Sequence, residues 1–134
     1  MKNAKLQHVD MTAGRTELHE LLSLSGTEVS INNLPAGVSI PFVHAHINNE
    51  ELYIVLLGKG SFFVDGEEFL ISEGDCLRVD PKGERCLKAA DDSALRYLCI
   101  QSRAGSLQGY TMSDGIISEE FKKRKFDTSI NLGA

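Results

Sequence analysis

The stretch that decides the fold runs from residue 37 to residue 58 and reads GVSIPFVHAHINNEELYIVLLG. In its first part every second position shares one face of a predicted strand: Ile40, Phe42, His44 and His46. Its second part, Glu51 to Leu57, predicts a strand that is apolar on both faces. Such a strand is typical of a sheet packed on another sheet or covered by a second subunit.

The same two-residue period continues on both sides of this stretch. Val29 and Ile31 alternate with polar neighbours before it, and further short apolar runs follow it as far as Gln101. Turn signals separate the runs at near-regular spacing: 34–37, 58–60, 65–66, 73–75 and 80–83. At least seven short strands separated by turns predict an all-β antiparallel fold, either closed or made of two sheets.

The N-terminal part has a different pattern. Leu18, Leu21 and Leu22 fall on one helical face, so a short helix is expected over residues 16–24, although a strand is an alternative. We expect one domain in three parts, because a chain of 134 residues is one domain by default. The parts are an N-terminal extension (1–27), a β core (28–101) and a polar C-terminal tail (102–134).

Composition excludes several classes of function. The chain has 14 Lys and Arg against 19 Asp and Glu, a net charge of −5, so no nucleic-acid partner is expected. The longest apolar run has six residues (52–57), too few to span a membrane. No signal peptide is evident and three irregularly spaced cysteines indicate free thiols, so we expect a cytoplasmic protein.

The chemistry of the chain is concentrated in two histidines and a carboxylate. His44 and His46 are two residues apart, so on a strand both imidazoles point the same way. Glu51 follows after a short loop and can bring its carboxylate to the same point; alternation favours it over Glu50, which faces the other side. Two imidazoles and a carboxylate suit a divalent transition metal and leave positions for water or substrate.

This stretch resembles the first motif of the cupin superfamily. That motif reads Gly, five residues, His-x-His, three or four residues, Glu, six residues, Gly. The chain has Gly37, six residues, His44 and His46, four residues, Glu51, six residues, Gly58. Only the first spacer differs, by one residue.

The second cupin motif is only partly present. It reads Gly, five residues, Pro-x-Gly, two residues, His, three residues, Asn. The chain has Gly74, six residues, Pro81 and Gly83, two residues, then Cys86, and after three more residues Ala90. Cys86 thus stands where cupins usually place a third metal-binding histidine.

The resemblance implies a small single-domain cupin of uncharacterised type, with an antiparallel jelly-roll barrel, usually as a homodimer. It implies one divalent ion per chain (iron, manganese, nickel or zinc) on His44, His46 and Glu51, with Cys86 as a candidate fourth ligand. A thiolate binds several of these metals well. Three further side chains would line the pocket for a small-molecule ligand: Ile40, Phe42 and Tyr53.

Two classes of function follow from this site. The first is an enzyme acting on a small oxygen-bearing molecule, by dioxygenase-like or by isomerase or lyase chemistry. Its general base is not evident, and only Tyr53 and Glu50 are distant candidates. The second is a non-catalytic metal-binding or small-molecule-binding module, such as a sensor or a structural dimer. A thiolate from Cys86 would favour this second class, because it would close the metal site.

Overall fold

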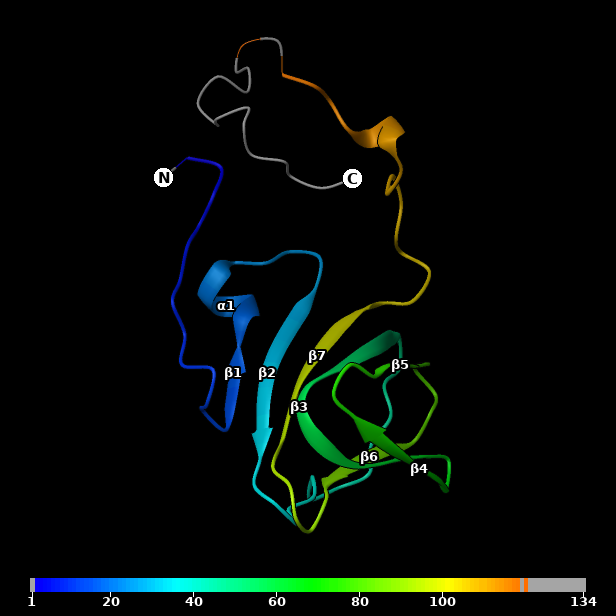
Figure 1. The fold of residues 1–134 in the computed structure, drawn as a ribbon. Coiled ribbons are helices and arrows are strands. Elements are labelled where there is room, and N and C mark those ends of the chain that lie inside the picture. Colours follow the sequence, from blue (N-terminus) through cyan, green and yellow to red (C-terminus); the bar gives the residue numbers. More distant parts are fainter. Residues whose placement is uncertain (1, 119, 121–134) are drawn as a thin grey trace.

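The computed structural model describes residues 2–118 and 120, and within them it is mostly antiparallel β structure (Figure 1). Seven strands, one short α-helix and one 3-10 turn follow in the order β1 (Arg15–Glu17), α1 (Leu18–Leu22), β2 (Glu28–Leu34), β3 (Asn49–Val64), β4 (Glu67–Ser72), β5 (Cys76–Val79), β6 (Arg85–Ala89), β7 (Leu95–Arg103) and η1 (Met112–Asp114). The sequence prediction of an all-β chain with a short N-terminal helix is confirmed.

The 16-residue strand β3 organises the molecule, because it belongs to two sheets. Its first half lies between β7 and β5, and β7 continues through β2 to β1 at the edge. Its second half lies between β4 and β6. The two sheets thus share a strand that curves from one to the other (Figure 1).

The turn expected at residues 58–60 is wrong, because β3 continues without a break through these residues. A register shift between Val55 and Leu57 bends the strand there instead. Gly58 follows with a φ of +83°, and a Cβ at this position would lie 1.8 Å from the carbonyl oxygen of Ala94. The glycine therefore permits a bend against β7 and does not end the strand.

Alternate residues of the strands form the core between the sheets. In β3, Glu51, Tyr53 and Val55 point inward, while their neighbours are only half-buried. The rings of Tyr53 and Phe62, one from each half of β3, meet edge to face with centroids 4.8 Å apart. The buried apolar cluster consists of Tyr53, Val55, Phe62, Ile71, Val79, Leu87, Ala89, Leu95, Tyr97 and Cys99.

Two segments flank the expected core of residues 28–101. The N-terminal helix is shorter than predicted, because Arg15 to Glu17 form strand β1 on the edge of β2 and Thr16 pairs with Ile31. Beyond β7 the described chain leads away from the strands (Figure 1). Of the predicted tail (102–134), residue 119 and residues 121–134 lie outside the described residues. Within the described part, no helix is both long and apolar enough to cross a membrane.

Candidate metal centre

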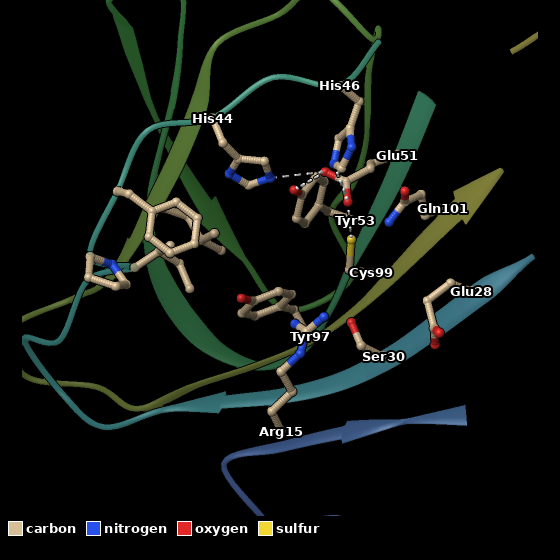
Figure 2. A pocket seen from close by; sticks show the side chains of 14 residues that line it. Arg15, Glu28, Ser30, His44, His46, Glu51, Tyr53, Tyr97, Cys99 and Gln101 are labelled. Atoms are coloured by element: carbon tan, nitrogen blue, oxygen red, sulfur yellow. Dashed lines mark hydrogen bonds and ion pairs between the residues drawn. The ribbon is translucent and has the colours of Figure 1, made fainter. Parts of the chain in front are cut away.

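The two histidines lie on a segment beside β6. The sequence predicts a strand for residues 40–46, but this is wrong, since within this range the structure has one isolated bridge, between His44 and Arg85. Pro41 interrupts the ladder because it has no N–H to donate. The backbone N–H of His44 donates to the Arg85 carbonyl (3.1 Å), and that of His46 donates to the Pro81 carbonyl (2.8 Å). These bonds hold both imidazoles over one end of the cavity (Figure 2).

Glu51 brings its carboxylate to the same point from the inner face of β3, and it is only 4% exposed. Its Oε1 accepts hydrogen bonds from Arg85 Nη1 and from the Tyr53 hydroxyl, both at 2.6 Å. Its Oε2 accepts from the Cys99 thiol at 3.2 Å. The carboxylate is therefore fixed, with Oε2 less fully occupied than Oε1.

The donor atoms of His44, His46 and Glu51 lie within 4.8 Å of one another. His44 Nε2 is 3.9 Å from Glu51 Oε1, and His46 Nε2 is 3.3 Å from Oε2. His46 Nε2 is nevertheless buried without a hydrogen bond, as is His44 Nδ1. Buried nitrogens without a hydrogen-bond partner are rare in folded proteins. Atoms that bind one ion through bonds of about 2.1 Å must lie close together, as the histidine nitrogens and the Glu51 oxygens do here. The three residues therefore fit a divalent metal.

The surroundings of His44 and Glu51 favour the forms of these two side chains that a metal requires. Burial lowers the pKa of His44, which favours the neutral imidazole with a free lone pair. Burial alone would raise the pKa of Glu51. The hydrogen bonds from Tyr53, Arg85 and Cys99 outweigh it and lower that pKa below its usual value.

Arg85 is the residue of this site that the sequence reasoning missed. Its side chain is fully buried, and besides Glu51 it donates to the backbone carbonyls of Asp80, Pro81 and Gly83. All of these hydrogen bonds run from the Arg85 guanidinium to oxygen acceptors. Arg85 therefore positions both the Glu51 carboxylate and the 80–83 turn.

Cys86, the candidate fourth ligand, is not part of this group of donors. Alternation along β6 turns Arg85 and Leu87 inward, so the intervening Cys86 points to the other side. Its thiol lies 3.4 Å from the carbonyl oxygen of Ile40, to which it donates. Cys86 has the spacing from Pro81 and Gly83 that the cupin motif gives to its third histidine. The side chain that points inward is instead that of Arg85, one residue earlier.

A cavity of about 410 Å³ opens in front of the three ligands. The predicted pocket residues Ile40, Phe42 and Tyr53 all line it. Pro41 and Leu87 complete an apolar wall, and the opposite wall is formed by side chains of β1, β2 and β7 that the sequence did not single out (Figure 2): Arg15, Glu28, Ser30, Tyr97, Cys99 and Gln101.

Neither candidate general base is suited to that role. Burial, followed by the nearby Cys99 and Glu51, raises the pKa of Tyr53, and its hydroxyl is already donated to Glu51. Glu50 is paired with Ser102 on the other face of β3 and does not line the cavity.

Comparison with known proteins identifies the family. The family model of the cupin domain matches residues 31–101, more than half of the chain. The chain belongs to the cupin family. The predicted cupin jelly-roll fold is thereby confirmed, and His44, His46 and Glu51 form a candidate metal site typical of cupins.

Three relatives place this cupin among known proteins. A cupin protein of Bacteroides fragilis has a crystal structure with 52% identity and a TM-score of 0.85, covering 88% of this chain and 99% of that one. A predicted oxalate decarboxylase of Thermotoga maritima is 26% identical with a TM-score of 0.51, covering 57% of this chain and 64% of that one. An uncharacterised protein of Methanocaldococcus jannaschii is 32% identical over 66 residues, which are 49% of this cupin and 52% of that protein. The chain thus spans about half the length of this curated relative.

Proposed function

We propose that this cupin is a metal-dependent enzyme. It would transform a small oxygen-bearing molecule in the cavity in front of His44, His46 and Glu51. The observation that carries the proposal is the convergence of His44, His46 and Glu51 at one end of that cavity. Three protein ligands leave positions that a substrate oxygen can fill. When bound, the ion supplies Lewis-acid polarisation, and one-electron chemistry if it is iron.

The surrounding residues of the chain support this function by holding and shielding the site. Arg85 and Tyr53 fix one oxygen of Glu51, and the other oxygen lies 3.3 Å from His46 Nε2. The apolar wall formed by Ile40, Pro41, Phe42 and Leu87 excludes water from one side of a bound molecule. The likeness to a predicted oxalate decarboxylase favours lyase chemistry on an acid, with dioxygenase or isomerase chemistry using the same ligands.

A second candidate is a binding module without catalysis. It is favoured by the state of Tyr53, a candidate base that lines the cavity but already donates its hydroxyl to Glu51. A module of this kind would bind metal and ligand and release the ligand unchanged.

Elemental analysis of protein purified without chelator tests the metal site. We expect about one equivalent of iron, manganese, nickel or zinc in the wild type, its loss in His44→Ala, and its retention in the matched control Cys86→Ser. No metal in the wild type, even after reconstitution, would overturn the proposal. Turnover of oxalate and of small hydroxy and oxo acids by the loaded protein, followed by NMR with and without air, then separates an enzyme from a module.

A further inference from the structure

Arg15 brings a fixed positive charge to the cavity from outside the region that matches the cupin domain. It lies on β1, and Figure 2 shows it on the other side of the cavity from His44 and His46. Its Nη1 donates to the side-chain oxygen of Asn32 at 2.8 Å, and the Asn32 amide donates to the Ser30 hydroxyl at 2.9 Å. Asn32 and Ser30 are buried, so the Nη1 bond ties the guanidinium of the half-exposed Arg15 side chain to a buried pair.

The charge of Arg15 is only partly committed within the chain. Nε pairs with Glu17 at 3.0 Å, an exposed contact of little strength. Within the described residues Nη2 has no hydrogen-bond acceptor. Burial raises the pKa of Tyr97, and the positive charge of Arg15 partly offsets that rise, so this charge acts on a side chain that lines the cavity.

The register of the sheet sets how far Arg15 lies from the metal ligands. Arg15 pairs with Asn32, Asn32 with Tyr97, and Tyr97 with Val55, so these residues form one row. Glu51 lies four residues before Val55, which is about 13 Å along the strand. From this backbone offset we expect a two-carbon acid such as oxalate to be too short to reach both ends, whereas a cavity of about 410 Å³ accepts a longer molecule.

The charges around the cavity favour a dianion. At the metal end the Arg85 guanidinium pairs with the Glu51 carboxylate at 2.6 Å, so a divalent ion would leave that end positively charged. Arg15 adds one positive charge at the other end. Glu28 adds one negative charge to the lining from β2, in the row of Gln101 and Glu51 and not in the row of Arg15.

We propose that the cavity binds an acid with two anionic groups separated by a carbon chain. One group would bind at the His44, His46 and Glu51 end, and the other would accept hydrogen bonds from Arg15. The carbon chain would pack on the apolar wall of Ile40 and Phe42. This assignment rests on the proposed function for its metal end, while the Arg15 subsite stands on its own geometry.

Calorimetric titration of the zinc-loaded full chain with oxalate, succinate, glutarate and adipate tests the proposal. We expect one of the longer acids to bind at least tenfold more tightly than oxalate. Arg15→Gln should lose about tenfold or more for that acid and leave oxalate within twofold, since a charge-assisted hydrogen bond is removed only from the longer ligand. Arg15→Lys, which keeps the charge, should lose less, and Arg78→Gln, on an exposed arginine of β5 away from the cavity, should match the wild type. Equal affinity of wild type and Arg15→Gln for every acid would overturn it.

A second titration separates this inference from the metal proposal. If equilibrium dialysis shows that zinc does not bind, the metal proposal fails, and the Arg15 subsite is then measured in chelator-treated protein with butyrate as the probe. We expect millimolar butyrate to shift the backbone amide NMR signals of Ser30 and Tyr97 in the wild type and not in Arg15→Gln. No shift in the wild type would overturn the subsite, whether or not zinc binds.

Discussion

A single carboxylate, that of Glu51, connects the fold to the candidate chemistry. Oε1 carries two short hydrogen bonds, from Arg85 and Tyr53, so it has little capacity left for another partner. Oε2 has one longer bond, from Cys99, and lies nearest to His46. We therefore expect Glu51 to act as a ligand through Oε2 alone.

Replacing Arg85 by methionine should destabilise the protein strongly. The variant leaves Glu51 without its cation and removes the donors to the carbonyls of Asp80, Pro81 and Gly83. Removal of one partner of a buried ion pair costs about 3–5 kcal/mol of unfolding free energy. Urea unfolding in the presence of a chelator measures this loss without a contribution from metal.

The control for this variant is Arg78→Met. Arg78 pairs with Asp80 at 3.0 Å, but both side chains are more than half exposed, so the loss should be below about 1 kcal/mol. Similar losses for the two variants would mean that burial of Arg85 does not matter to stability.

Alkaline titration should reveal two hidden tyrosines. Burial raises the pKa of both Tyr53 and Tyr97 well above the usual value of 10.0. Above that pH the unfolded chain releases protons that the folded chain retains, so stability is complete below pH 10 and is lost as the pH rises. Of the chain's three tyrosines, Tyr53 and Tyr97 should contribute tyrosinate absorbance only as circular dichroism records unfolding. Absorbance from all three before unfolding would contradict this.

Residue chemistry predicts some members of this site and not others. His44, His46 and Glu51 could be found because their donor atoms suit one ion and their spacing suits neighbouring segments. Arg85 could not, since a charged residue in a strand is ordinarily assigned to the solvent face. Its burial depends on a carboxylate 34 positions earlier, a pairing that no local pattern contains.

At the scale of elements, the bend of β3 depends on Gly58. Gly58→Ala should destabilise the protein more than Gly66→Ala, although both glycines have φ near +83°. Alanine at either position adds about 1–2 kcal/mol of backbone strain. Only at position 58 would the new Cβ also overlap the Ala94 carbonyl, whereas nothing lies within 4 Å at position 66. Urea midpoints of the two variants test this, and equal losses would contradict it.

The strands themselves were largely predictable, because alternation and turn residues act locally. The two errors, at residues 58–60 and 40–46, arise because pairing with distant strands decides the structure there and the local pattern does not. Residues 58–60 look like a turn, but pairing with β7 and β4 keeps them within β3, with only a bend at Gly58. Residues 40–46 look like a strand, but Pro41 and the lack of a continuous partner reduce them to one isolated bridge.

At the scale of the whole molecule, the outer face of the larger sheet carries an apolar patch of Leu52, Ile54, Leu98 and Ile100. The register pairs Leu52 with Ile100 and Ile54 with Leu98, and all four are half-buried. We propose that this patch is the interface of a homodimer. Light scattering at micromolar concentration should give twice the 14.7 kDa of one chain.

The same measurement on two variants tests the location of the interface. Ile100→Glu should give a monomer, because it places a charge in the patch. Leu70→Glu, on an exposed residue of β4, should leave the dimer intact. A wild-type mass near 14.7 kDa would contradict the homodimer.

Because β3 belongs to both sheets, we expect the central parts of the two sheets to unfold together. We expect the amides of β3 to exchange with deuterium only through global unfolding, more slowly than those at the edge strand β1. Whatever binds at Glu51, near one end of β3, should then slow exchange equally at Phe62, near the other end. The length of one strand thus makes occupancy of the cavity measurable on the opposite side of the molecule.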